Sequence, residues 1–140
     1  MSFLPEEDRE FLGESGITCQ ELVEKMPDGK ARRGVLFPSF SFSGDLRAQP
    51  NGGSLVKVDA CDLLVVIPDG YSTTKLDSFY TIPKLRRPDG REPLSATADS
   101  PLFGRTWQFW SRHLDDQDWR VGIDGLRTFM NYIRGELRNA

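Results

Sequence analysis

The sequence predicts an α+β fold, with helices packed on one face of an antiparallel sheet. Three observations lead to this prediction. Apolar runs that suit strands fill the first part of the chain, turn-forming residues separate these runs, and a clear amphipathic helical pattern lies near the C-terminus. The expected order is an N-terminal helix, a four-stranded antiparallel meander, a long loop and a C-terminal helix. A chain of 140 residues is most simply one domain, spanning 1–140.

A short helix is expected at the N-terminus. Pro5 suits the first helical position, because its missing N–H would have no helical partner there in any case. The acidic residues at 6–8 suit the positive end of the helix dipole. Gly13 and Gly16 are expected to end the helix.

The four strands are expected at residues 17–26, 35–42, 56–67 and 78–82. In the third, which is the strongest, alternate apolar residues should face opposite sides of the sheet. One side takes Leu63, Val65 and Ile67, and the other takes Leu64 and Val66. Pro38 indicates an edge or a bulge in the second strand, since proline cannot donate to a ladder. Turn-sized and loop-sized links between consecutive strands favour an antiparallel meander.

The last third of the chain predicts a long loop and then a helix. Residues 84–103 are rich in Pro, Asp and Ser, and long irregular loops in compact domains are often functional. After Trp119, Asp124 suits the N-cap of a helix. The apolar residues of that helix recur at offsets of three, four and seven, which predicts one buried stripe. They are Leu126, Phe129, Met130, Ile133 and Leu137.

Composition narrows the class of protein. The chain is 38% hydrophobic and 28% charged, as in an ordinary globular protein, and its net charge of −3 disfavours nucleic-acid binding. Cys19 and Cys61 lack CxxC partners, so neither a disulfide framework nor a metal site is expected, and no cofactor is implied. The acidic N-terminal residues do not resemble a signal peptide, and the longest apolar run is too short to cross a bilayer. A cytoplasmic protein with no membrane partner is therefore expected.

The most informative segment is 104–114, which holds two of the three tryptophans, the single histidine, a serine and two arginines. His113 is the only imidazole, and an imidazole changes its charge near neutral pH, so it is suited to proton transfer. Trp107, Trp110 and Leu114 recur at the i, i+3 and i+7 spacing of a helix, which predicts ordinary core packing. A structural histidine on an aromatic face is the alternative to a catalytic one.

Five segments resemble ubiquitin-conjugating (E2) enzymes and, more closely, the divergent bacterial group called prokaryotic E2 family E. They are 3–8, 68–71, 104–107, 110–113 and 119–126, and they are distributed along nearly the whole chain. The turn at 68–71 is similar to the proline-to-tyrosine turn of E2 enzymes, with Ser72 in place of their second proline. Trp119 resembles the tryptophan that follows the E2 active site. The blocks that contain tryptophan are the most specific part of the resemblance.

The resemblance implies an E2-like fold and a place in a bacterial ubiquitin-like conjugation pathway, of the kind associated with anti-phage defence. An E1-like activating enzyme and a ubiquitin-like protein are the implied partners, and a JAB-type metallopeptidase is expected in the same pathway. The implied role is that of an E2-like transferase, which accepts or positions the C-terminus of the ubiquitin-like protein.

The expected nucleophile is missing. An E2 enzyme uses a cysteine thiolate, and the resemblance implies this cysteine eight residues before Trp119, where the chain has Ser111. The chain also lacks the His-Pro-Asn motif, whose asparagine helps to stabilise the oxyanion in E2 enzymes. The nature of the nucleophile, and whether catalysis is retained, is therefore the main question.

Three interpretations stay open. In the first, Ser111 accepts the acyl group as an oxyester and His113 is its base. This needs an extended chain, because helical residues two apart diverge by about 200°. In the second, the chain is a catalytically inactive adaptor or scaffold that binds the E1-like enzyme and the ubiquitin-like protein. In the third, His113 acts without Ser111, as a base or oxyanion donor for a nucleophile on a partner chain.

Two further sets of residues complete the candidate site. Arg112 and Arg105 are candidates for binding a C-terminal carboxylate, because a guanidinium group pairs with it bidentately, although both equally suit a solvated surface. Trp107 and Trp110 are the accompanying candidate binding residues.

Other nucleophiles and another enzyme class are less favoured. Free cysteines are commonly small buried apolar residues, which argues against Cys61 and Cys19 as nucleophiles. A hydrolase with a Ser-His pair, unrelated to E2 enzymes, ranks last because the chain has no G-x-S-x-G motif and no assignable third residue.

Overall fold

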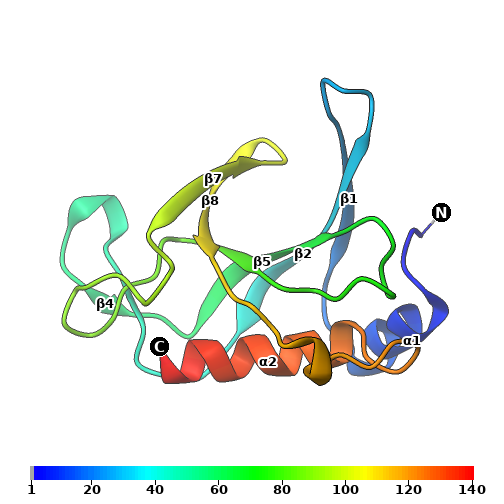
Figure 1. The fold of residues 1–140 in the computed structure, drawn as a ribbon. Helices are drawn as coiled ribbons and strands as arrows, with labels where there is room; N and C mark the ends of the chain where they lie inside the picture. The colour runs from blue at the N-terminus through cyan, green and yellow to red at the C-terminus, as the bar shows by residue number, and fades with distance from the viewer. Residues whose placement is uncertain (1) are drawn as a thin grey trace.

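The computed structural model describes residues 2–140, in which two α-helices accompany a curled antiparallel sheet (Figure 1). The helices are α1 (Glu6–Ser15) and α2 (Leu126–Asn139), with short 3-10 turns at η1 (Pro50–Gly52) and η2 (Asp116–Asp118). The strands are β1 (Gln20–Lys25), β2 (Ala31–Ser41), β3 (Arg47–Ala48), β4 (Val56–Lys57), β5 (Ala60–Ile67), β6 (Phe79–Ile82), β7 (Ala98–Leu102) and β8 (Arg105–Trp110). Both helices lie below the sheet in Figure 1, so the predicted α+β class is confirmed.

The main sheet differs from the predicted meander in its number of strands. Among the described residues it has six, in the order β1-β2-β5-β6-β8-β7, with every neighbouring pair antiparallel. The predicted strands correspond to its first four, but β8 and β7 extend the sheet beyond β6, so the four-stranded prediction is wrong. The strand expected at 56–67 is also divided, because its first residues form β4 and pair with β3 in a separate two-stranded sheet.

The β7–β8 hairpin lies where the sequence predicted the end of a loop and suggested a helix. β7 contains Asp99, Ser100 and Pro101, which give it the composition of a loop. Phe103 and Gly104, which connect the strands, both have positive φ, and this suits a two-residue turn between twisted strands. Residues 98–102 therefore belong to the sheet, and the irregular loop ends before them.

Trp107 and Trp110 in β8 are three residues apart, which is also the spacing of residues on one face of a helix. Residues three apart in a strand face opposite sides of the sheet. Trp107 packs with Leu64 and Leu102 on one side. Trp110 packs into the main core on the other side and stacks on Phe79, with 5.2 Å between ring centroids. Because both sides of β8 are covered, both tryptophans are buried.

Several local predictions are confirmed. The five apolar residues predicted for the last helix are all fully buried in α2, and the odd and even apolar residues of β5 face opposite sides as expected. The register of β2 against β5 shifts around Pro38, which is the predicted bulge. Gly16 ends α1 in a left-handed conformation with φ of 68°. Gly13 lies inside that helix, so the prediction that it helps to end it is wrong.

The N-terminus of α2 is capped by a residue of α1. The buried Asp8 carboxylate accepts the Leu126 N–H at 3.0 Å through Oδ1 and the Tyr71 hydroxyl at 2.5 Å through Oδ2. The prediction that Asp124 is the cap is wrong, because its carboxylate is engaged elsewhere and makes no cap hydrogen bond. Asp8 therefore joins α1, the turn after β5 and the start of α2.

A buried glutamine holds the loop between β6 and β7. Oε1 of Gln108 accepts the Thr81 hydroxyl at 3.0 Å and the Leu85 N–H at 2.7 Å. Its Nε2 donates to the carbonyls of Leu85 at 3.0 Å and Ala96 at 2.9 Å. The amide thus uses both acceptor and both donor positions. Residues 83–97 are fixed near both ends by this one side chain.

Candidate functional site

An open groove of about 530 Å³ lies where β8 ends. Three parts of the chain form its walls: the segment after β8, the loop between β6 and β7, and the C-terminal end of α2. Ser111 and His113 come from the first part, Leu94 and Ser95 from the second, and Glu136 from the third. This β8 groove contains both of the residues that the sequence predicts to be catalytic.

The chain leaves β8 without forming a helix, and burial alternates along it. The more buried residues are Trp110, Arg112 and Leu114, and the exposed ones are Ser111 and His113. Such alternation is typical of an extended chain, in which residues two apart face the same side. The geometric condition for pairing Ser111 with His113 is therefore met. Within the described residues no hydrogen bond joins the hydroxyl to the ring.

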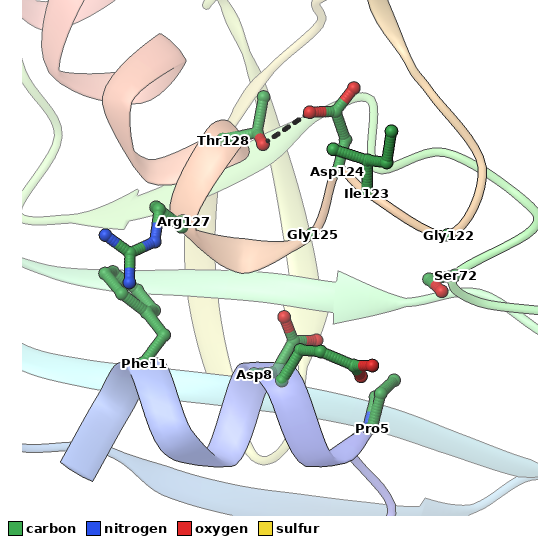
Figure 2. Close-up of a pocket in the computed structure, with 11 residues that line it drawn as sticks. Pro5, Asp8, Phe11, Ser72, Gly122, Ile123, Asp124, Gly125, Arg127 and Thr128 are labelled. Carbon is green, nitrogen blue, oxygen red and sulfur yellow. Dashed lines mark hydrogen bonds between the residues drawn. The ribbon is translucent and has the colours of Figure 1, made fainter. Parts of the chain in front are cut away.

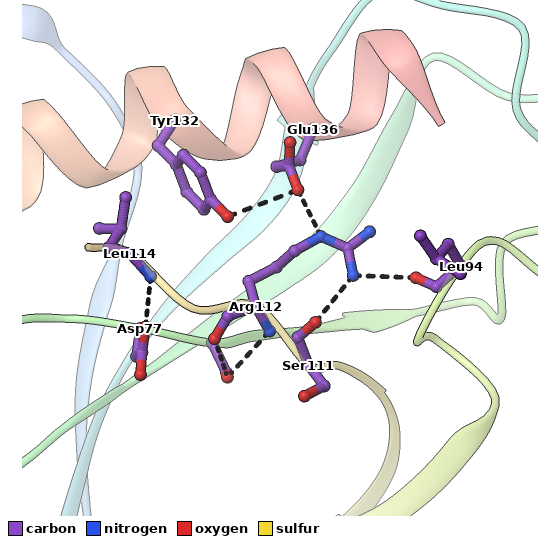
Figure 3. Close-up of polar contacts among 8 residues, drawn as sticks. Asp77, Leu94, Ser111, Arg112, Leu114, Tyr132 and Glu136 are labelled. Atoms are coloured by element: carbon purple, nitrogen blue, oxygen red, sulfur yellow. Dashed lines mark hydrogen bonds and ion pairs between the residues drawn. The ribbon is translucent and has the colours of Figure 1, made fainter. Parts of the chain in front are cut away.

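Arg112 anchors this segment to its neighbours (Figure 3). Its Nε pairs with Glu136 of α2, and its Nη1 donates to the carbonyls of Leu94 and Ser111, each at 2.9 Å. The guanidinium also lies 5.1 Å from the centroid of the Trp110 ring. The side chain is only 13% exposed, so its observed partners are within the protein. Its predicted binding of a terminal carboxylate stays a prediction.

His113 has a carboxylate neighbour that the sequence did not reveal. Its Nδ1 lies 3.3 Å from Oδ2 of Asp77, and the side chain of His113 is 78% exposed. The other oxygen of Asp77 accepts the Leu114 N–H at 2.7 Å. Asp77 lies just before β6, and a polar residue before a strand is typical of any loop. No local signal in the sequence therefore connects it with His113.

Comparison with known protein families shows which family the chain resembles. The model of prokaryotic E2 family E matches residues 4–140. The chain belongs to prokaryotic E2 family E. No curated protein and no solved structure matches it. The predicted resemblance to a bacterial E2-like protein is confirmed over almost the whole chain.

Two of the segments for which the sequence predicts a resemblance to E2 enzymes contact each other in this family E chain. Trp119 is buried, and its Nε1 donates to the Ser72 carbonyl at 3.0 Å. The rings of Trp119 and Tyr71 lie 6.4 Å apart between centroids. The segment that follows the β8 groove is thus tied to the turn after β5, which is tied through Tyr71 to Asp8.

Neither cysteine of this family E protein lines the β8 groove. Cys61 is 3% exposed in β5, and burial, with the charge of Asp62 second, raises the pKa of its thiol to about 12. Cys19 is half-buried just before β1, where burial and then the charge of Glu21 raise its pKa. Because the thiolate is the nucleophilic form, both environments disfavour a nucleophilic role.

The remaining candidate binding residues lie outside the β8 groove. Arg105 pairs with Asp62 at 2.9 Å and lies 4.9 Å from the centroid of the Trp107 ring. Trp107 and Trp110 are almost completely buried, and their Nε1 atoms donate to the Leu102 carbonyl at 3.0 Å and the Thr81 hydroxyl at 2.9 Å. Both rings are satisfied core residues. A binding role for these three residues stays a prediction.

Within residues 2–140, no group of three or more His, Cys, Asp or Glu side chains is placed to hold a metal ion. None of the helices in this part of the chain combines the length and the apolar character that crossing a bilayer requires.

A second hollow, of about 150 Å³, lies between α1 and the start of α2 (Figure 2). Asp124, on its wall, is 5% exposed and accepts the Thr128 hydroxyl at 2.9 Å and the Arg120 N–H at 2.6 Å. Hydrogen bonds from the Arg120 side chain, and then from its backbone, lower the pKa of the Asp124 carboxyl to about 2. Asp124 therefore stays charged in the folded protein under acidic conditions in which an ordinary aspartate is protonated.

Asp124→Asn should remove part of the acid sensitivity of the fold. An ordinary aspartate has a pKa of about 4, so the unfolded chain takes up this proton before the folded protein does. The stabilisation by the carboxylate is complete above about pH 4 and is lost as the pH falls toward about 2. Thermal unfolding followed by circular dichroism across this interval should show a steeper loss for the wild type than for the variant. Asp59→Asn, at an exposed carboxylate, should keep the wild-type slope, and equal slopes for the wild type and Asp124→Asn would contradict the prediction.

Proposed function

We propose that this protein is the E2-like component of a bacterial ubiquitin-like conjugation pathway, acting in the cytoplasm, and that Ser111 accepts the ubiquitin-like C-terminus from an E1-like enzyme. Membership of family E supports the E2-like role. The observation that carries the choice of site is the exposure of Ser111 and His113 on the same side of an extended segment in the β8 groove. The pathway that the family resemblance implies also includes a JAB-type metallopeptidase.

The proposed transfer is an exchange of a thioester for an oxyester. Oγ of Ser111 attacks the carbonyl carbon of the thioester that joins the ubiquitin-like protein to the E1-like enzyme. An O–C bond forms and the C–S bond breaks, while the hydroxyl proton passes to Nε2 of His113 and then to the leaving thiolate. In a second step an amine of the target attacks the oxyester: an N–C bond forms and the O–C bond breaks, while a proton of the amine passes to Nε2 of His113 and then to the leaving serine oxygen.

A serine needs a base for this step more than a cysteine does, because its hydroxyl is a weak nucleophile at neutral pH. His113 is the only imidazole in the chain and faces the same side as Ser111. Hydrogen bonds of catalytic groups are often long or absent before substrate binds, so their separation in the unbound protein is compatible with the proposed role. Arg112 adds support, because it holds the Ser111 carbonyl and the Leu94 loop around the groove.

The test is a reconstituted transfer reaction. The full chain is mixed with its cognate E1-like enzyme, the ubiquitin-like protein and ATP, and covalent adducts are separated by electrophoresis. We expect an adduct that survives thiol reductants, is cleaved by hydroxylamine and is lost in Ser111→Ala. Ser43→Ala, at an exposed serine in the loop after β2, and Cys19→Ser should both keep the adduct.

His113→Ala provides the second half of this test. Removing a general base typically slows a reaction by about 10²-fold or more, so adduct formation should slow by at least that factor. The exposed ring contributes little packing, so the thermal midpoint should not change. An adduct on another residue would overturn the assignment of Ser111. If no adduct forms although both partners still bind, the proposed enzymatic role is overturned. This is the result expected for the inactive adaptor.

A further inference from the structure

We infer that Asp77 is a positioning residue that holds the His113 ring in the tautomer with its proton on Nδ1, and so leaves the Nε2 lone pair available as a base. The use of that lone pair toward Ser111 rests on the proposed function. The choice of tautomer does not, because it depends only on contacts within this chain. Ser111, His113 and Asp77 then have the roles of nucleophile, base and orienting carboxylate.

The contact between the two side chains favours one tautomer. Nδ1 of His113 lies 3.3 Å from Oδ2 of Asp77. An ionised carboxylate only accepts hydrogen bonds, whereas a neutral imidazole carries its proton on either nitrogen. If Nδ1 had no proton, its lone pair would face the carboxylate oxygen and the two would repel. The proton is therefore more stable on Nδ1 than on Nε2.

Several bonds between two segments keep Asp77 in this place. Its Oδ1 accepts the Leu114 N–H at 2.7 Å, and the Lys75 ammonium donates to the Leu114 carbonyl. The neighbouring Ser78 hydroxyl donates to the Arg112 carbonyl at 3.2 Å and lies 3.3 Å from the Arg112 nitrogen. The chain before β6 is thus joined on both sides of His113 to the chain after β8. Asp77 is fixed by these backbone contacts and not only by its exposed contact with the ring.

Orientation, and not stability, is the expected effect of this pair. The side chains of His113 and Asp77 are 78% and 37% exposed. Ion pairs between side chains this exposed contribute little to folding. The carboxylate nevertheless removes the freedom of the ring to exchange its proton between the two nitrogens. Substitution of Asp77 should therefore change the state of the ring more clearly than it changes the stability of the fold.

The single histidine makes this state directly measurable. Long-range ¹H–¹⁵N NMR spectra of the uniformly labelled full chain contain one set of ring signals, and at a pH where the ring is neutral they show which nitrogen carries the proton. We expect a protonated Nδ1 in the wild type. In Asp77→Asn the side-chain oxygen can still accept the Leu114 N–H, which turns the amide donor toward Nδ1, so the proton should move to Nε2. Asp115→Asn removes another exposed carboxylate from the same segment and should leave the ring signals unchanged.

Each outcome decides something. A wild-type ring protonated on Nε2, or an unchanged tautomer in Asp77→Asn, would overturn the inference. In the transfer assay, Asp77→Asn should form the adduct about 10²-fold more slowly, as expected when a general base is lost. A reversed tautomer with an unchanged rate would show that the lone pair of Nε2 is not the base. If no adduct forms on Ser111 in any variant, the proposed function fails, yet the NMR result still decides the role of Asp77.

Discussion

Replacing Gln108 with leucine is expected to lower the free energy of unfolding by about 3–5 kcal/mol. Gln108 is 2% exposed, and its amide satisfies one hydroxyl, one N–H and two carbonyls. Leucine has a similar volume but leaves all four groups without that partner. An unsatisfied buried polar group costs about 1–3 kcal/mol, so four of them make the loss large for a single substitution, although burial of the apolar leucine side chain offsets part of the sum.

Chemical denaturation with urea measures this loss, and amide hydrogen exchange locates it. The Leu85 N–H should exchange much faster in Gln108→Leu, because its acceptor is gone. Gln20→Leu makes the same chemical change at an exposed position of β1 and should alter the unfolding free energy by less than about 0.5 kcal/mol. A loss in Gln108→Leu no larger than in this control would contradict the prediction. Because Gln108 holds the loop that carries Leu94 and Ser95, the same variant should also loosen the wall of the β8 groove.

Replacing Asp8 with alanine is expected to lower the free energy of unfolding by about 2–4 kcal/mol. The substitution removes the cap of α2 and leaves the Leu126 N–H and the Tyr71 hydroxyl without their acceptor. Burial and the hydrogen bond to Asp8 both raise the pKa of Tyr71, so the tyrosine remains neutral and the loss is one of hydrogen bonding. Three elements that surround the main core would then lose their common contact.

The size of the effect should depend on what acceptor remains. Asp8→Asn keeps an oxygen for the Leu126 N–H, so its stability should lie between those of the wild type and Asp8→Ala. Glu7→Ala removes an exposed acid from the same turn of α1 and should change the unfolding free energy by less than about 0.5 kcal/mol. Urea denaturation of the three variants tests the order. Equal stability of Glu7→Ala and Asp8→Ala would contradict the prediction that the cap by Asp8 stabilises the fold.

Gly125 packs directly against the contact between Asp8 and Tyr71. A Cβ at this position would lie 2.5 Å from Oδ1 of Asp8 and 3.1 Å from the Tyr71 hydroxyl. The backbone at Gly125 therefore lies so close to the Asp8 carboxylate that only glycine fits at this position. This close approach explains how a residue in the first turn of α1 reaches the first N–H of α2.

Gln108 and Asp8, two buried polar residues, show which contacts could not be predicted from the sequence. Gln108 lies between two tryptophans and shares its strand face with Trp110, so its polarity was a visible signal that it needed partners. Its partners at 81, 85 and 96 had no such signal, because two of them contribute only backbone atoms. Asp8 was assigned to the dipole of its own helix, whereas its carboxylate acts on a different one.

The candidate site divides in the same way. Ser111 and His113 were predicted from the sequence, through the tryptophan-containing motifs and the spacing to Trp119. Asp77 was not found, because it becomes a neighbour of His113 only when β6 pairs with β8. That pairing also decides the shape of the chain after β8. The helical spacing of Trp107 and Trp110 concealed the strand. In a strand that is covered on both sides, residues that face opposite sides are all buried, so the buried residues need not alternate.

By itself, the sequence determined the features that depend on neighbouring residues. These are the buried stripe of α2, the two faces of β5, the bulge at Pro38 and the family membership. Only the tertiary structure decided which segments cover each other, and with them the β7–β8 hairpin, the cap by Asp8 and the approach of Asp77 to His113. The physical reason is that periodicity records which face of an element is buried and contains no information on which distant residue lies against it.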